Sequence, residues 1–369
     1  MRIAYDNQIF CWQPYGGISR YFYEIAKGIS CTPGAEVTVF CPLYVNNYLV
    51  NRPESLRLKG INIPLIPRGG RLYRAIGSPL TRYWLNKYKP AVVHETYYAN
   101  RRLAPAMSKV VLTVFDMIHE KFSNNYSSFD PTAIEKANAV SRADHIICIS
   151  ENTRRDVIEI LKVPPEKTSV VYLASSLGRP TATVGSGTGK PFLLYVGSRF
   201  GYKNFSGLLA AYSRSMLLKK DFDLVCFGGG AFNDEERALM LELGIPANNV
   251  QYLAGNDDFL ASLYSKAAVF VYPSKYEGFG LPPLEAMSTG CPVVCSNSSS
   301  LPEVVGDAAE LFDPYDEDQL RTSLEKVVTL ENLRKDLGER GSRRAATFSW
   351  DRCAEETLAI YKIMSPGHA

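Results

Sequence analysis

The sequence predicts an α/β protein built from two doubly wound, Rossmann-like domains that face each other across a cleft. Short runs rich in β-branched and aromatic residues alternate with segments of helical periodicity along the chain, which is typical of parallel sheets covered on both faces. A length of 369 residues is more than one compact core usually accommodates. Between two series of strands lies "SSLGRPTATVGSGTGK", whose Gly, Ser and Thr content indicates a linker.

The two series of strands set the expected domain boundaries. The first contains "RIAYD", "EVTVF", "AVVHE", "VVLTVFD", "HIICIS" and "SVVYL"; the second contains "PFLLYVG", "DLVCFGG", "NVQYLA", "AVFVYPS" and "CPVVCS". We expect an N-terminal domain at 1–175, a linker at 176–190 and a second domain at 191–349. Residues 350–369 are expected to form a terminal helix, because Ser349 is a good N-cap and helical periodicity follows it. Ligands of open α/β sheets bind beyond the carboxyl ends of the strands, so the cleft is the expected site.

Composition narrows the class of protein. Hydrophobic residues make up 46% of the chain and charged residues 21%, as in folded soluble proteins. The N-terminus lacks a signal-peptide pattern and no apolar run approaches ~20 residues, so we expect a cytoplasmic protein. The eight cysteines have no framework spacing and are expected to be reduced core thiols. Residues 1–180 hold 23 Lys and Arg against 14 Asp and Glu, which suggests that the first domain faces something anionic.

Two cations follow the first strand of the second domain. In "YVGSRFGYKNF", Arg199 and Lys203 stand four positions apart after Gly197, where the chain leaves the sheet toward a helix. Cations at the carboxyl end of a parallel strand suit a diphosphate. A solvated basic loop is the alternative interpretation.

The stretch "YPSKYEGFGLPPLEA" places Glu277 in a loop and Glu285 about one turn inside a helix that begins near Leu281. The two glutamates are poorly placed to act as a paired acid and base. The two glutamates are better suited to accept hydrogen bonds from hydroxyls at the two ends of one extended ligand. The Gly-Phe-Gly turn and the helix start would then face an anion in the middle of that ligand. A nucleotide sugar has that layout. A capping acid and a surface glutamate remain the alternative.

In the first domain, Gly16 and Gly17 directly precede a helix. Backbone N–H groups at such a start can approach an anion, although a plain tight turn explains the pair equally well. The spacing is not G-x-G-x-x-G, which disfavours a nicotinamide or flavin cofactor, and we expect no cofactor.

Three motifs in order, "YGGISRY", "GSRFGYKN" and "EGFGLPPLE", closely resemble those of the retaining GT-B glycosyltransferases of family 4. The resemblance covers nearly the whole chain and includes the tryptophan-led terminal helix, which in such enzymes packs back toward the first domain. It implies hexosyl transfer from a nucleotide diphosphate sugar, with GDP-mannose favoured over a UDP-sugar, to a saccharide or lipid-linked saccharide in cell-surface polysaccharide or lipopolysaccharide synthesis.

The resemblance implies that the N-terminal domain, 1–175, binds the acceptor and that the domain at 191–349 binds the nucleotide sugar. Carried over to this sequence, it also implies that Glu277 contacts the donor sugar and Glu285 the ribose. Arg199 and Lys203 would neutralise the leaving diphosphate, and Gly16 and Gly17 would approach the phosphate and the acceptor. Main-chain contacts would come from the run of residues that includes Phe279, Gly280 and Leu281.

The sequence departs from the family at one place. Many members carry His-Asp after the strand that corresponds to "VVLTVFD", where this chain has Phe115 and Asp116. Asp116, His119, three residues further on, and His94, in "VVHETYY", are the candidates to contact the acceptor or the transferred sugar. A structural role is the alternative for His119.

Other functional classes are less well supported. Asp257 and Asp258 precede an apolar-periodic helix and are better explained as capping than as metal ligands, so no metal is expected. The basic, apolar segment Arg68 to Lys89 suits anionic lipid at the inner face of a membrane, or an ordinary surface helix; no nucleic-acid motif accompanies it. An epimerase or a phosphorylase with the same cleft, and a non-catalytic sugar-nucleotide binding protein, remain alternatives.

Overall fold

The computed structural model describes residues 1–66, 69–127, 129–178 and 190–365. The chain divides into two compact units. Unit 1 comprises Met1–Leu173 together with the C-terminal segment from Ser349, and unit 2 comprises Ala174–Phe348. Most of the predicted linker, residues 179–189, lies outside the described residues.

Unit 1 contains a parallel sheet of seven strands within its described part, in the order β3-β2-β1-β4-β5-β6-β7. These strands are β1 (Arg2–Tyr5), β2 (Glu36–Tyr44), β3 (Arg57–Asn62), β4 (Val92–Glu95), β5 (Lys109–Val114), β6 (His145–Cys148) and β7 (Thr168–Val170). The helices are α1 (Gly17–Ser30), α2 (Asn47–Val50), α3 (Gly70–Tyr88), α4 (Ile118–Lys121), α5 (Thr132–Arg142), α6 (Glu151–Leu161) and α15 (Trp350–Met364).

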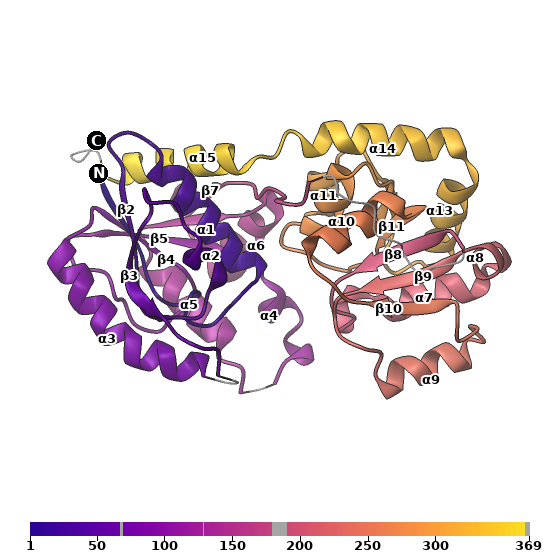
Figure 1. The fold of residues 1–369 in the computed structure, drawn as a ribbon, viewed down its shortest axis with the longest axis horizontal. Coiled ribbons are helices and arrows are strands. Elements are labelled where there is room, and N and C mark those ends of the chain that lie inside the picture. The colour runs from indigo at the N-terminus through magenta and orange to yellow at the C-terminus, as the bar shows by residue number, and fades with distance from the viewer. Residues whose placement is uncertain (67–68, 128, 179–189, 366–369) are drawn as a thin grey trace. The chain divides into compact units, whose positions relative to one another are not determined.

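Alternation along each strand of unit 1 sends side chains to both faces of the sheet, and both faces are buried. On one face, β-strand residues such as Ala4 and Val93 pack in a cluster with Leu85 of α3 and Ala139 of α5. On the other face lie α1 and α15, which pack against each other, as Figure 1 shows. The terminal helix α15 therefore belongs to unit 1.

A buried polar network fixes α15 to this sheet. The Nδ1 atom of His94 lies 2.5 Å from the Tyr361 hydroxyl of α15, and its Nε2 atom lies 2.9 Å from the Thr113 hydroxyl. Tyr361 also shares a hydrogen bond with Tyr5, and Thr113 shares one with Tyr21 of α1. Because all of these groups are buried, each bond satisfies a polar atom that has no access to water.

Unit 2 repeats the architecture with a parallel six-stranded sheet in the order β10-β9-β8-β11-β12-β13, counted over its described residues. The strands are β8 (Phe192–Val196), β9 (Asp223–Phe227), β10 (Val250–Leu253), β11 (Val269–Tyr272), β12 (Val293–Ser296) and β13 (Glu310–Phe312). The helices are α7 (Phe205–Arg214), α8 (Met216–Asp221), α9 (Asp234–Glu242), α10 (Asp257–Lys266), α11 (Leu281–Ser288), α12 (Leu301–Val305), α13 (Glu317–Thr329) and α14 (Glu331–Ala345).

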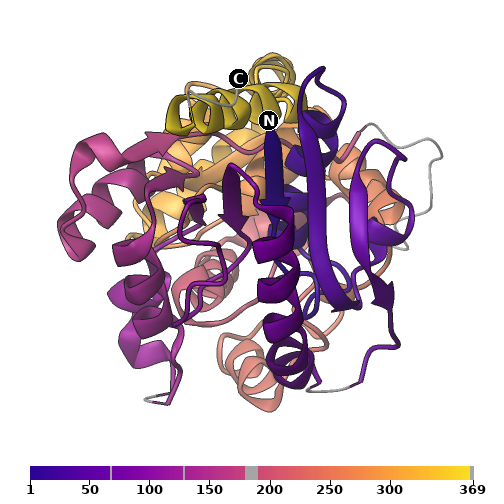
Figure 2. The same ribbon diagram turned by 90° about the vertical axis from the view of Figure 1, so that its left-hand side faces the viewer.

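Each unit is thus a doubly wound, Rossmann-like layer structure, as the alternation of strands and helices predicts. Figure 2 shows the parallel strands of unit 1 and the helices that cover them from a second direction. In each sheet the strand order reverses once, between β1 and β4 in unit 1 and between β8 and β11 in unit 2. Such switch points form crevices at the carboxyl ends of the strands. Among the described residues, no helix is both long and apolar enough to cross a membrane.

Candidate active site

Three of the residues that the sequence predicts to bind the donor, Gly197, Lys203 and Glu277, lie at the switch point of unit 2. Gly197 follows β8 directly and has a φ of 130°, a conformation that favours glycine. Lys203 comes from the short turn after β8, and Glu277 comes from the loop after β11. Because β8 and β11 are neighbours, these two loops leave the sheet side by side.

Lys203 and Glu277 form an ion pair at this position. The Lys203 Nζ atom donates to Glu277 Oε1 at 2.6 Å and to the Tyr272 hydroxyl at 3.1 Å. The two side chains are only 13% and 10% exposed. Burial opposes the charged form of Lys203, but the Glu277 carboxylate and Tyr202 outweigh it and raise the pKa of Lys203. The site therefore holds a fixed ammonium group at neutral pH.

A run of serines after β12 holds the Glu277 loop in place. The Ser299 hydroxyl accepts from the Glu277 N–H at 2.8 Å. The Ser300 hydroxyl lies within hydrogen-bond distance of the Glu277 and Phe279 carbonyls, at 2.9 and 2.7 Å. These serines belong to none of the motifs named above, although a serine cluster directly after a buried strand, "CSNSSS", is a signal for side chains that bond nearby backbone.

Helix α11 begins where the sequence predicts, and it carries Glu285 one turn inside. Gly280 has a φ of 116°, and a Cβ there would lie 2.7 Å from the Leu301 side chain, so glycine is required for both reasons. Leu281 is the first helical residue. Glu285 is 8% exposed and accepts a hydrogen bond from the Tyr264 hydroxyl at 3.3 Å. Glu277 thus lies in the loop after β11 and Glu285 lies in α11, as the sequence predicts.

Arg199 makes contacts within unit 2 that the sequence pattern does not indicate. Its guanidinium group pairs with Glu236 at 2.7 Å and donates to the carbonyls of Gly228, Gly230 and Ala231 at 2.8 to 3.1 Å. The side chain is only 4% exposed. Its guanidinium group therefore holds the loop after β9, through acceptors that are distant in sequence.

In unit 1, Gly16 and Gly17 stand at the start of α1, with Gly17 as the first helical residue. The Gln13 side chain accepts from the Ser19 N–H at 3.3 Å, and a Cβ at Gly16 would collide with that side chain. A Cβ on Gly17 would meet no atom within 4 Å. Close packing therefore explains Gly16, and Gly17 leaves the helix start open to an approaching group.

His94 does not reach a binding surface. It is fully buried, and both of its ring nitrogens are bonded to hydroxyls inside unit 1. Burial lowers the pKa of His94 to about 3, so the ring is neutral. This placement departs from the expectation of an acceptor contact, because a strand histidine on the α15 face points into the core.

Asp116 and His119 lie together near α4. Asp116 accepts from the Ile118 N–H at 3.0 Å and lies 3.8 Å from the Lys136 ammonium. The His119 ring stacks on Tyr126 at 4.1 Å, and its Nε2 atom lies 3.8 Å from Asp130. Phe115 is buried and packs edge-on against Tyr21 of α1.

Asp257 and Asp258 occupy the first turn of α10, where the Asn256 side chain caps the Phe259 N–H at 2.9 Å. Within the described ranges, no group of three or more His, Cys, Asp and Glu side chains could hold a metal ion. The cysteines are free thiols, and all except Cys31 are buried.

Comparison with known proteins identifies the family. The family "Glycosyl transferases group 1" matches residues 182–344, and "Glycosyltransferase Family 4" matches residues 15–177. O-antigen chain mannosyltransferase B of Escherichia coli is 32% identical over 307 residues, which cover 79% of this chain and 79% of that protein. The chain belongs to glycosyltransferase family 4. It is a glycosyltransferase of a retaining hexosyltransferase family.

One further relative and two solved structures are also similar to this chain. The MMP alpha-(1->4)-mannosyltransferase of Mycolicibacterium hassiacum is 33% identical over 238 residues, 62% of this chain and 56% of that protein. Sucrose-phosphate synthase of Thermosynechococcus elongatus superposes with a TM-score of 0.75 at 20% identity, over 99% of both chains. Anabaena HepE in complex with UDP and glucose gives 0.72 at 17% identity, over 98% and 99%. These likenesses show the GT-B fold.

Proposed function

We propose that this family 4 enzyme transfers a mannosyl group from GDP-mannose to a saccharide acceptor during synthesis of a cell-surface polysaccharide or lipopolysaccharide. The observation that carries the proposal is the fixed ammonium of Lys203 beside Glu277 at the unit 2 switch point, where a nucleotide diphosphate sugar suits the chemistry. The mannosyl group follows from the two mannosyltransferase relatives, and the UDP complex of HepE makes a UDP-sugar the second candidate.

In this proposal unit 2 holds the donor. An ammonium has three N–H donors, and Lys203 uses two on Glu277 and Tyr272. The third donates to the leaving diphosphate. Glu277 accepts from a hydroxyl of the donor sugar through its carboxylate, and Glu285 accepts from the ribose. The main-chain N–H groups at Gly280 and Leu281 face the phosphates from the start of α11.

Arg199 takes a different part from the one the family motif suggests. It holds the glycine loop at 228–230, whose three residues have φ between 74° and 82°, beside Gly197. Arg199 is therefore a positioning residue, and Lys203 supplies the principal positive charge. Gly17, at the open start of α1, remains the proposed contact of unit 1 with the phosphate or acceptor.

The proposed reaction is a front-face displacement with retention. The bond between the anomeric carbon and the donor phosphate oxygen breaks, and the acceptor hydroxyl oxygen bonds to that carbon on the same face. The hydroxyl proton passes to the departing phosphate. Catalysis rests mainly on stabilisation of the leaving diphosphate by preorganised charge and dipoles.

The test of the donor is a thermal-shift series with GDP, UDP and ADP. A ligand at about 100 times its dissociation constant stabilises the folded state by about 2.7 kcal/mol, so GDP is expected to raise the melting temperature most. Equal shifts, or a larger shift with UDP, contradict the GDP preference. Donor consumption without an acceptor alcohol would favour an epimerase, and dependence on inorganic phosphate would favour a phosphorylase.

The outer side of α3 supports a peripheral contact with an anionic membrane at its cytoplasmic face. Four apolar side chains at helical spacing are 41 to 61% exposed, and cationic side chains flank them: Leu72, Ile76, Leu80 and Tyr83, with Arg82 and Lys87. This pattern suits partial insertion among anionic headgroups. Vesicles that contain about 30% phosphatidylglycerol should retain the wild type and release Ile76→Glu. Equal retention of both proteins would exclude the contact.

A further inference from the structure

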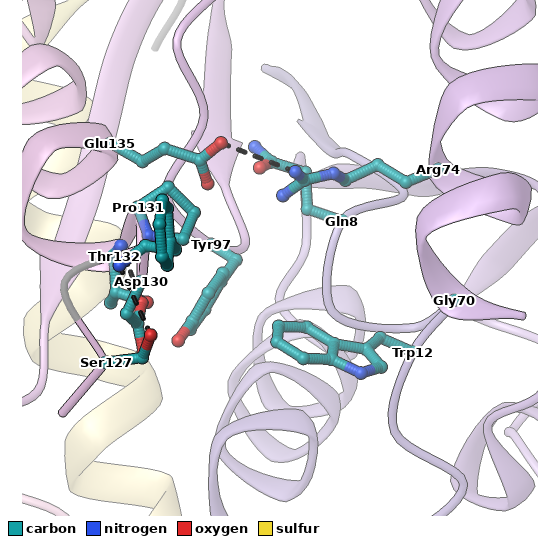
Figure 3. A pocket seen from close by; sticks show the side chains of 11 residues that line it. Gln8, Trp12, Gly70, Arg74, Tyr97, Ser127, Asp130, Pro131, Thr132 and Glu135 are labelled. Atoms are coloured by element: carbon teal, nitrogen blue, oxygen red, sulfur yellow. Dashed lines mark hydrogen bonds and ion pairs between the residues drawn. The ribbon is translucent and has the colours of Figure 1, made fainter. Parts of the chain in front are cut away.

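Unit 1 carries a pocket that the donor site does not use. It lies at the β1/β4 switch point and has a volume of about 440 Å³, within the ~300–1,000 Å³ of small-molecule sites. Its walls come from the loop after β1, the loop after β4, and the starts of α3 and α5, as Figure 3 shows. Figure 3 also shows that the lining combines aromatic rings with polar groups.

An aromatic corner forms one side of the pocket. The rings of Trp12 and Tyr97 meet edge to face, with centroids 5.7 Å apart, and Figure 3 shows them next to each other. Trp12 is 53% exposed, although burial normally removes such a large apolar surface from water. A sugar ring offers an apolar face of C–H groups that packs on an aromatic ring, while its hydroxyls remain free to bond polar neighbours.

Gln8 supplies an unused acceptor in the same pocket. Its amide nitrogen donates to Asp6 at 2.7 Å, which orients the amide. Its Oε1 atom is buried and has no hydrogen-bond partner among the described residues, and the residue is 2% exposed. A buried acceptor without a donor costs about 1–3 kcal/mol. A ligand hydroxyl would satisfy it.

Arg74 and Glu135 complete the polar side. Their closest atoms, Nη2 and Oε1, are 3.5 Å apart, a long and weak contact that a hydroxyl can bridge by accepting from one group and donating to the other. Figure 3 shows the Gln8 amide at the end of the pocket where these two side chains meet. Arg74 is balanced by Glu135, and Asp130 adds a further carboxylate to the lining. The charge balance therefore disfavours an anionic ligand.

We propose that this pocket binds the uncharged terminal sugar of the acceptor glycan. The ring packs on Trp12 and Tyr97, and neighbouring hydroxyls bond Gln8 Oε1 and the Arg74–Glu135 pair. The inference rests on the proposed function, since it assigns the acceptor of that reaction. It also specifies the acceptor class: a neutral glycan end enters the pocket, and any diphosphate of a lipid carrier stays outside it.

The experiment uses the full chain and the methyl glycoside of α-linked mannobiose as the probe, with saturation-transfer NMR and a titration. Trp12→Ala should weaken probe binding at least about tenfold, Trp12→Phe should retain most of it, and a mannuronate disaccharide should bind more weakly than mannobiose. Ile363→Ala removes another exposed apolar side chain of unit 1, on α15, and serves as the control. GDP-induced thermal shifts of all variants report whether unit 2 remains folded and able to bind nucleotide.

Unchanged probe affinity in Trp12→Ala, or tighter binding of the mannuronate, overturns the pocket assignment even when the GDP shift and donor turnover are normal. Absence of a shift with every nucleotide, together with absence of donor turnover in the wild type, overturns the proposed function instead. In a steady-state assay, Trp12→Ala should raise the acceptor KM at least about tenfold and leave the donor KM within about twofold. Equal changes in both constants would indicate a general structural role and contradict the pocket assignment.

Discussion

Replacement of Lys203 by Met separates the catalytic role of its charge from its structural role. The side chain is 13% exposed, and its partner Glu277 is 10% exposed. Removal of the ammonium leaves a largely buried carboxylate without its cation. Loss of one partner costs about 3–5 kcal/mol in a fully buried pair, and the remaining exposure lowers the expected loss here to about 2 kcal/mol.

The double variant Lys203→Met/Glu277→Gln removes both charges. We expect it to be more stable than the sum of the two single changes predicts, by a coupling free energy of about 1–2 kcal/mol. Turnover should behave differently. Loss of one preorganised contact to developing charge lowers turnover about 10²- to 10³-fold, and the double variant should not recover it.

The assay combines chemical denaturation with nucleotide release from the donor in the presence of acceptor. Lys335→Met, which changes an exposed lysine of α14 in the same unit, is the control and should leave both quantities unchanged. Turnover of Lys203→Met within about threefold of the wild type, or recovery of turnover in the double variant, would contradict a catalytic role for the Lys203 charge.

Changes at Arg199, Glu285 and His94 test the roles of three further side chains. Arg199→Lys should lower the free energy of unfolding by about 1–3 kcal/mol, because one ammonium cannot bond both Glu236 and the loop carbonyls. If the affinity for GDP falls further than this loss of stability explains, Arg199 contacts the phosphate directly. Glu285→Gln should weaken the binding of GDP about tenfold, because the proposed ribose contact is lost. It should leave the affinity for mannose 1-phosphate, which has no ribose, unchanged. Titration measures both affinities, and equal losses would contradict the ribose contact. Burial lowers the pKa of His94 to about 3. Its contribution to stability is therefore present above about pH 6.5 and is lost as the pH falls toward 3, by up to about 1.4 kcal/mol per pH unit. Denaturation at about pH 7.5 and about pH 5 should show this loss in the wild type, and an identical loss in His94→Gln would contradict it.

The fold was predictable because strands that are buried on both faces appear in the sequence as apolar runs. The alternation of such strands with helices allows few chain topologies. The start of α11 was also predictable, since Gly280 and the following prolines mark a helix N-terminus. Local pattern alone defines such features.

The partners of the site residues were not predictable in the same way. Lys203 and Glu277 are 74 positions apart, and only the adjacency of β8 and β11 brings them together. Arg199 matches a phosphate-binding pattern, but its acceptors come from the loop after β9 and from Glu236 of α9. His94 lies on the strand face that α15 covers, and it bonds Tyr361 of that helix, which arrives from the far end of the chain.

The pocket of unit 1 depends on the same kind of long-range assembly. Gln8 and Trp12 are near Tyr97 because β1 and β4 are neighbours, and Arg74 and Glu135 belong to separate helices. The periodicity of the sequence predicts none of these contacts, because it indicates which face of a helix or strand is buried and not which element packs against that face.

The proposed reaction is tested most directly by the nucleotide released from a panel of GDP-, UDP- and ADP-sugars, with the configuration of the new glycosidic bond determined by NMR. We expect acceptor-dependent release of GDP from GDP-mannose, an α-linked mannosyl product, and a loss of turnover of about 10²-fold or more in Lys203→Met. A β-linked product, or full activity in Lys203→Met, would contradict it.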